Sequence, residues 1–83
     1  MSQKSHTKDE KFMLALHATA LQSGDAQAAF NRYQIGAKIG LHPKATDTIC
    51  TLLLQANFIK KESAEEVYLS TNGMQLVQKI LAE

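Results

Sequence analysis

Residues 32–51 read RYQIGAKIGLHPKATDTICT, and this stretch decides the fold. Two glycines, Gly36 and Gly40, lie four residues apart in it, and Pro43 follows shortly afterwards. Gly40 predicts the end of a helix, because the left-handed backbone of a tight turn is costly for residues other than glycine. Pro43 predicts the first position of a following helix, where its missing N–H is not needed. The stretch therefore predicts two helices joined by a short turn.

The residues around the turn set the extent of these two helices. Asn31 is a good helix cap, and Gln34 is placed to bond back to it in a capping-box-like arrangement. The first helix is therefore predicted to begin at Asn31 and to bury Ile35 and Ile39. The second helix is predicted over residues 43–56. Its inner face repeats at helical spacing in Thr46, Ile49, Cys50 and Leu53.

Upstream of this pair, residues 8–22 carry the apolar spacing of a helix with charges in its first turn. Ser23 and Gly24 predict the end of that helix. Residues 25–30 predict a connector, with one helical turn as an option because the segment is rich in alanine. The first residues, 1–7, predict a loose N-terminus.

Downstream of the pair, extended runs at 58–62 and 66–70 are separated by three residues and predict a β-hairpin. Ser70 or Thr71 then caps a last helix that ends near residue 81. The predicted fold is mainly α with a small β-hairpin, in the order helix, helix, helix, hairpin, helix. The whole chain is predicted to form a single domain.

The glycine pair and its neighbours resemble a helix-turn-helix motif. Gly36 stands where the two helices of that motif cross, and Gly40 stands at its turn. The apolar positions of the motif are filled by Ile35, Ile39, Leu41 and Ile49. Thr46 occupies a position where an aliphatic side chain is more usual.

Two further segments resemble characteristic segments of winged-helix regulators. LLQANFI at 53–59 is similar to the end of their recognition helix, with Asn57 in place of the usual glycine. VYLSTNG at 67–73 is similar to the junction that closes the wing in families such as MarR and PadR. The resemblance spans residues 31–81 and implies a winged helix-turn-helix domain.

That resemblance implies a small transcriptional regulator that binds double-stranded DNA sequence-specifically. In such domains the second helix of the motif, here residues 43–56, lies in the major groove. The implied contacts from its outer face are Lys44, Thr48, Thr51 and Gln55. The implied phosphate contacts are Arg32, Lys38, Lys60 and Lys61. Each of these side chains has a plain alternative, which is a solvated surface position.

The charge distribution only partly fits this function. Residues 31–61 carry five cations and one anion, a net charge of +4, in a chain whose net charge is +1. However, the predicted wing tip from Glu62 to Glu66 is acidic, and phosphates repel carboxylates. The recognition helix contains no arginine, and Leu52 points outward from it. These features favour an alternative function, a winged helix that binds another protein through the Leu52 surface instead of DNA.

Composition and residue spacing narrow the classes of protein to which the chain can belong. The chain has the hydrophobic and charged fractions of an ordinary globular protein, without an apolar run of the roughly 18 residues that a membrane span needs. Its single cysteine predicts the reducing cytoplasm. The sequence has no catalytic pair, metal-ligand spacing or phosphate-binding glycine loop, so we expect no enzyme, metal site or cofactor. A homodimer through the terminal helices is expected, because one domain with few cations binds DNA weakly.

Overall fold

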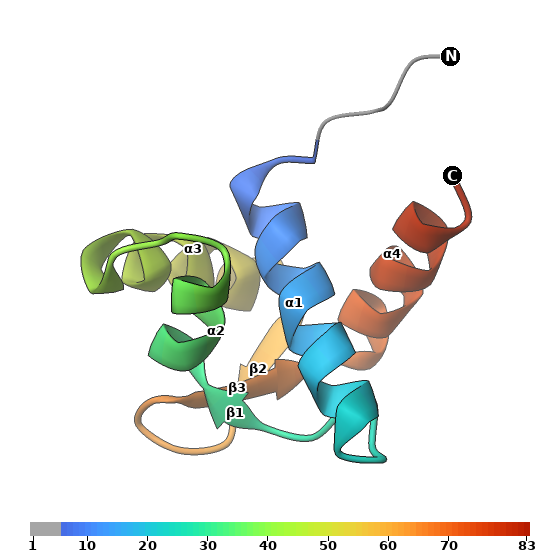
Figure 1. The fold of residues 1–83 in the computed structure, drawn as a ribbon, viewed down its shortest axis with the longest axis horizontal. Coiled ribbons are helices and arrows are strands. Elements are labelled where there is room, and N and C mark those ends of the chain that lie inside the picture. The colour runs from blue at the N-terminus through green and yellow to red at the C-terminus, as the bar shows by residue number, and fades with distance from the viewer. Residues whose placement is uncertain (1–5) are drawn as a thin grey trace.

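The computed structural model describes residues 6–83, and in them four helices pack with a small antiparallel sheet, which lies at the bottom of the view in Figure 1. The elements are α1 (Lys8–Gln22), β1 (Phe30–Asn31), α2 (Arg32–Lys38), α3 (Pro43–Gln55), β2 (Ile59–Lys61), β3 (Glu66–Leu69) and α4 (Thr71–Leu81). This architecture confirms the predicted fold class and is compatible with a winged-helix-like fold. The observed order adds one strand, β1, to the predicted one.

Helix α1 begins with a capping box that the sequence prediction missed. The Thr7 side chain accepts a hydrogen bond from the Glu10 backbone N–H, and the Glu10 carboxylate accepts one from the Thr7 N–H at 2.9 Å. Thr7 was predicted to belong to a loose N-terminus, and it is instead a well-bonded helix cap. The other residues of that predicted segment, apart from His6, lie outside the described residues.

Three helices end in the same way, with a Schellman motif around a left-handed residue. After α2, Gly40 has φ +79°, and the N–H of Leu41 donates to the Gly36 carbonyl at 2.9 Å. After α3, Asn57 has φ 64° and takes the place of the usual glycine, as the sequence indicated. The end of α1 at Gly24 follows the same pattern. Local turn chemistry therefore fixes where these helices stop.

Helices α2 and α3 cross at Gly36. A Cβ atom at this position would overlap the hydroxyl of Thr46, which is fully buried on the facing side of α3. This close approach explains why threonine occupies a position where a larger aliphatic was expected. The Thr46 hydroxyl has no hydrogen-bond partner among the described residues. The crossing therefore depends on two small side chains.

The sheet has the strand order β1-β3-β2, with antiparallel pairing throughout. The hairpin of β2 and β3 confirms the prediction, and it is closed by residues 62–65, which we call the wing loop. Residues 25–30 form the predicted connector, without the helical turn that their alanines left as an option. The Asp25 carboxylate accepts from the Gln27 N–H at 2.9 Å in a tight turn, and the chain then enters β1. Phe30 pairs with Val67 of β3, a contact between distant parts of the sequence.

Helix α4 is capped by Ser70, one of the two predicted cap residues. The Ser70 hydroxyl accepts from the Gly73 N–H at 3.0 Å and donates to the Asn57 carbonyl at 2.6 Å. A Cβ atom at Gly73 would overlap the Phe58 carbonyl, so α4 packs directly on the end of α3 and the start of the hairpin. The helix also lies against α1, which runs through the middle of the molecule (Figure 1).

The core lies between α1, the crossed helices and the sheet. Its fully buried side chains come from every one of these elements and include Phe12, Leu16, Ile35, Ile59 and Val67. None of the helices within residues 6–83 is long and apolar enough to span a membrane. The core leaves one side of α3 exposed, and that side forms the candidate site.

Candidate nucleic-acid interface

Helix α3 has one buried and one exposed side. The predicted inner face, formed by Thr46, Ile49, Cys50 and Leu53, is buried as expected. At about 100° per residue, Lys44, Thr51 and Gln55 lie near the middle of the opposite, exposed strip. Asp47 lies at one edge of that strip and Leu52 at the other. The exposed strip is therefore mainly polar, with one acidic residue at one edge and one apolar residue at the other.

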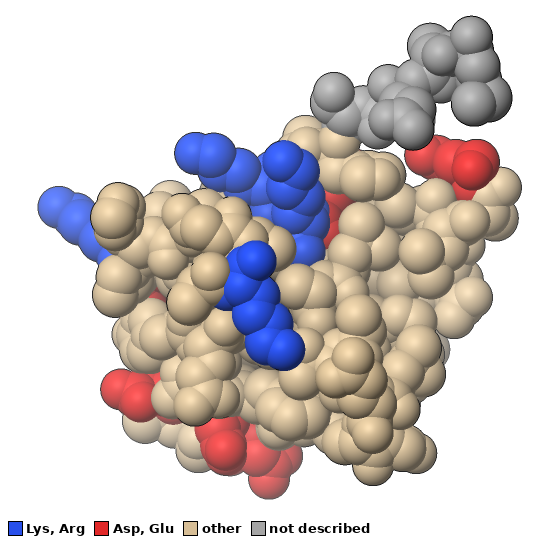
Figure 2. Space-filling view, in the orientation of Figure 1, with Lys and Arg blue, Asp and Glu red and all other residues tan. Residues whose placement is uncertain are grey.

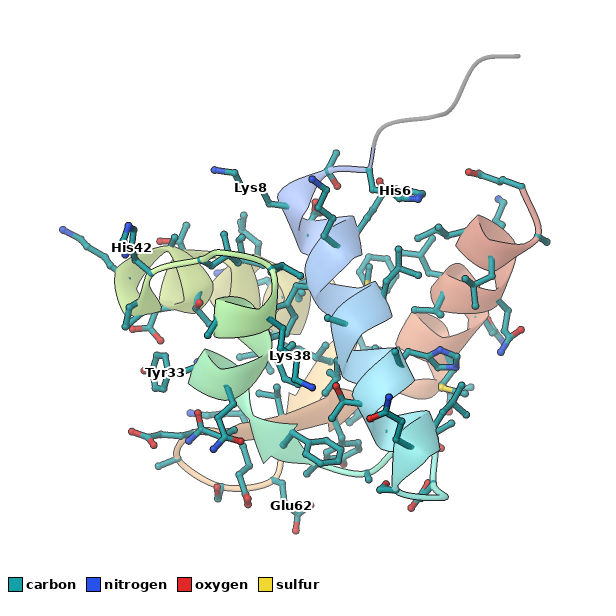
Figure 3. The ribbon with its side chains drawn as sticks, in the orientation of Figure 1. His6, Lys8, Tyr33, Lys38, His42 and Glu62 are labelled. Atoms are coloured by element: carbon teal, nitrogen blue, oxygen red, sulfur yellow. The ribbon has the colours of Figure 1, made fainter. Side chains whose placement is uncertain are left out.

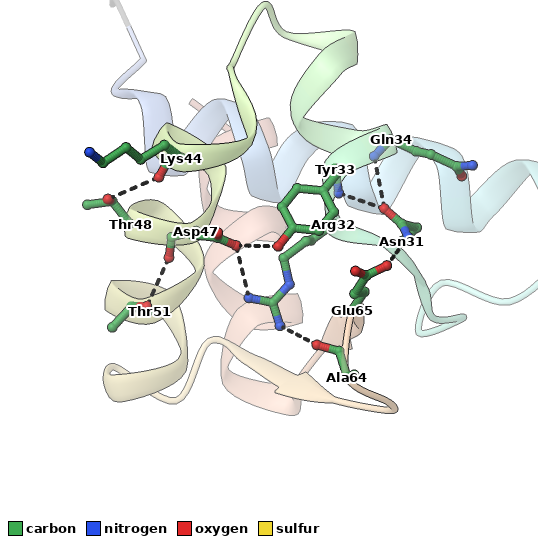
Figure 4. Close-up of polar contacts among 10 residues, drawn as sticks. All are labelled: Asn31, Arg32, Tyr33, Gln34, Lys44, Asp47, Thr48, Thr51, Ala64 and Glu65. Atoms are coloured by element: carbon green, nitrogen blue, oxygen red, sulfur yellow. Dashed lines mark hydrogen bonds and ion pairs between the residues drawn. The ribbon is translucent and has the colours of Figure 1, made fainter.

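Two of the predicted contact residues already use their hydroxyl protons. The Thr48 hydroxyl donates to the Lys44 carbonyl at 3.2 Å, and the Thr51 hydroxyl donates to the Asp47 carbonyl at 2.9 Å (Figure 4). Both side chains are exposed, so their hydroxyl oxygens remain accessible as acceptors. Lys44 projects away from the body of the protein, which leaves its ammonium group accessible (Figure 4).

Arg32 occupies an interior position that the sequence did not indicate. Arg32 is only 7% exposed to solvent. The guanidinium Nη1 lies 3.7 Å from Oδ1 of Asp47, and Nη2 donates to the Ala64 carbonyl at 3.4 Å. Its Nε is buried without a hydrogen-bond partner among the described residues. This placement does not favour the phosphate contact that was predicted for Arg32, because the side chain already joins α2, α3 and the wing loop.

Asp47 is held by a second group from α2. The Tyr33 hydroxyl donates to Oδ1 of Asp47 at 2.8 Å. This hydrogen bond to a carboxylate raises the pKa of Tyr33 above its ordinary value of 10.0, because ionisation of the phenol would break it. Tyr33 and Arg32 thus converge on one carboxylate oxygen (Figure 4). We call these three side chains the Asp47 cluster.

The wing loop is tied to the start of α2. The Arg32 backbone N–H donates to the Glu65 carbonyl at 2.9 Å, and the Asn31 amide donates to the Glu65 carboxylate at 3.2 Å. The Asn31 side chain also caps α2 by accepting from the N–H groups of Tyr33 and Gln34. The return bond predicted from the Gln34 side chain is absent from the hydrogen bonds of the described residues, and that side chain is exposed.

Lys60 and Lys61 are both exposed, but they lie on opposite faces of the hairpin. Lys60 pairs with Tyr68, whereas Lys61 pairs with the fully buried Val67. Paired residues of an antiparallel ladder share a face of the sheet. The Lys61 side chain therefore lies at the edge of the sheet face that packs on the core, and the Lys60 side chain lies on the opposite, outer face. A flat polyanion can meet only one of them squarely.

Charged side chains are unevenly distributed over the visible surface (Figure 2). The basic part lies over the first turn of α1, the end of α2 and the start of α3, whereas acidic side chains lie along the edge near the sheet and also beside the first turn of α1 and at the C-terminal end. Figure 3 places Lys8 and Lys38 in the basic part and Glu62 at the acidic edge. Lys38 donates to the Thr19 hydroxyl at 3.1 Å and stays exposed. In the sequence, the neighbouring Asp9 balances the charge of Lys8.

Within residues 6–83, no three histidine, cysteine or acidic side chains lie close enough to hold a metal ion. Cys50 is fully buried, and burial raises the pKa of its thiol to about 11. Leu21 on α1 and Leu81 on α4 are large exposed apolar side chains on the helices predicted to dimerise.

Comparison of the chain with protein families, with curated proteins and with solved structures finds no significant match.

Proposed function

We propose that this chain is a small transcriptional regulator that binds double-stranded DNA sequence-specifically, with helix α3 in the major groove. The observation that carries this proposal is the exposed polar strip of α3, set opposite a fully buried inner face. A helix held in this way can enter a groove without disturbing the core. We also propose that the wing contributes little, because its loop is acidic and is tied to α2.

The contacts differ in kind along the interface. Lys44, in the first turn of α3, reaches a phosphate or a guanine edge, and Thr51 and Gln55 meet base edges further along the helix. Lys38, at the end of α2, contacts the backbone beside the groove. Gln55 suits adenine, to which its amide can make two hydrogen bonds.

A homodimer is part of the proposal. The isolated domain offers Lys38, Lys44 and one of the two hairpin lysines, and so few phosphate contacts give weak binding at physiological salt. Two copies on a palindrome double that number and place the two α3 helices about one helical turn of DNA apart. The exposed Leu21 and Leu81 are the candidate contacts on the terminal helices. Sedimentation of the protein alone and with DNA measures this association.

The test is a salt titration of binding to duplex DNA, followed by fluorescence anisotropy, for the wild type, Lys44→Ala and Lys79→Ala. Lys79 is an exposed lysine of α4, far from the strip, so its variant is matched in charge. We expect log affinity to fall linearly with log salt, and Lys44→Ala to reduce the slope by about 0.9 for each copy bound, the value for a single phosphate contact. Lys79→Ala should leave the slope unchanged. Binding that does not depend on salt, or no binding by the folded protein, contradicts the proposal.

A protein-binding winged helix is the second candidate, and exposed Leu52 favours it. This side chain is 56% exposed on the same helix as the proposed readers. Exposed apolar patches mark protein contacts, and Leu52 would belong to such a patch. Leu52→Lys separates the two functions, because it should abolish capture of a protein partner and should preserve or increase affinity for DNA.

A further inference from the structure

We infer that Asp47 determines base specificity by accepting a hydrogen bond, through its Oδ2 atom, from the amino group of a cytosine in the major groove. This inference rests on the proposed DNA-binding function. It assigns to Asp47 a preference at one base position, and it assigns to Tyr33 and Arg32 the task of orienting the carboxylate.

The first argument is geometric. Within the described residues, the Asp47 side chain is contacted by Tyr33 at 2.8 Å and by Arg32 at 3.7 Å, and both groups engage Oδ1. Oδ2 therefore has no partner among the described residues, although the side chain is 51% exposed. A carboxylate held at one oxygen presents the other in a restricted direction. Such an oxygen is a prepared acceptor at the edge of the α3 strip.

The second argument is electrostatic. A free carboxylate on a DNA-facing helix is repelled by phosphates, which normally excludes it from the interface. Here the Arg32 guanidinium, whose side chain is 9% exposed, lies beside Asp47 and offsets its charge. Because Arg32 is buried, it remains with Asp47 instead of moving to a phosphate. The pair can then approach DNA at a smaller electrostatic cost than a lone aspartate.

The third argument concerns the base. A carboxylate only accepts hydrogen bonds, so it needs an amino group that projects into the groove. Cytosine N4 and adenine N6 are the two such groups in the major groove. Adenine presents its N7 acceptor beside N6, and N7 repels a second acceptor. Cytosine has no acceptor on its own exposed edge beside N4, so it is the better partner for Asp47.

The experiment selects binding sites from a random duplex pool with the wild type, Asp47→Ala, Asp47→Asn and Glu62→Gln. For the wild type we expect one position in each half-site with a cytosine preference of about tenfold. Asp47→Ala should lose that preference alone. Asp47→Asn should also lose it, because Tyr33 and Arg32 hold the amide oxygen and the remaining amide nitrogen only donates, which favours a purine N7 over the cytosine amino group. Glu62→Gln removes a wing carboxylate of the same charge and should leave every preference unchanged.

A second variant tests the positioning groups. Tyr33→Phe removes the hydroxyl that holds Oδ1 and keeps the ring, so it should weaken the cytosine preference without affecting the other positions. Circular dichroism confirms that each variant is folded. If the Asp47→Ala variant keeps the cytosine preference, or if the wild type has none, the inference is wrong and the proposed function still stands. If the folded wild type selects no DNA, both are wrong.

Discussion

Helix α3 and the wing loop are held in place by different forces. The inner side of α3 is anchored by buried side chains such as Ile49 and Leu53. Residues 62–65 of the wing loop are all exposed, and hydrogen bonds to Asn31 and Arg32 hold the loop. Apolar packing makes α3 a rigid element, whereas exposed polar ties are individually weak.

The two regions also differ in charge, because the start of α3 is basic and the wing loop is acidic. Lys38 and Lys44 flank the turn that leads into α3, whereas the wing loop carries Glu62 and Glu65. The wing loop therefore acts as a brace. Through Arg32 it supports the start of α2 and the Asp47 cluster, and it offers little to a polyanion.

The largest effect is expected at the helix crossing. Gly36→Ala should lower the free energy of unfolding by about 2–3 kcal/mol, because the new methyl group overlaps the Thr46 hydroxyl and forces α3 away from the core. Urea unfolding measures the change, and Gln34→Ala, at an exposed site of the same helix, is the control. The double variant Gly36→Ala, Thr46→Ala should recover part of the loss. A loss below about 0.5 kcal/mol in Gly36→Ala would show that α3 is not held by this contact.

The buried side of α3 also predicts a pH dependence. Burial raises the pKa of Cys50 from 9.0 to about 11, so the folded state keeps the thiol proton after the unfolded chain has lost it. This stabilisation is complete below pH 9 and is lost as the pH rises through about 11. The stability difference between the wild type and Cys50→Ala should therefore change by on the order of 2 kcal/mol across that range. A constant difference from pH 7 to 11 means that the thiol is open to solvent.

The hydrogen bond between Asn31 and Glu65 should contribute less to stability than the helix cap that Asn31 also provides. Asn31→Ala removes both the α2 cap and the bond to Glu65, and it should cost about 1 kcal/mol of unfolding free energy. Glu65→Ala removes only the exposed bond, and its effect should stay within about 0.5 kcal/mol. Equal losses in thermal or urea unfolding would assign the stability to the wing tie instead of the cap.

The smallest effect is expected at the wing tip. Glu62→Lys should raise DNA affinity by less than about threefold, because exposed charges away from the contact surface interact weakly through water. Gln78→Lys adds a cation to the exposed side of α4 and serves as the control. An increase of tenfold or more, measured by anisotropy at physiological salt, would place the wing against the DNA backbone and reverse the comparison.

Sequence patterns were reliable where the controlling interactions are local. The ends of the helices at Gly24, Gly40 and Asn57, and the Ser70 cap, each depend on bonds to residues within a few positions along the chain. The inner face of α3 follows from helical periodicity and was predicted residue by residue. The exposed positions of Lys44 and Gln55 follow from the same periodicity, whereas their contact with DNA stays a prediction.

The sequence by itself determined which segments are helices, where they stop and which side of α3 is apolar, because these properties depend on local bonding and spacing. Only the tertiary structure decided that Phe30 and Asn31 join the sheet, since a strand of two residues is stable only when it is paired with β3. The tertiary structure also decided that the Arg32 side chain is buried. The burial of that side chain depends on Asp47 and Ala64, which the fold brings from distant parts of the chain.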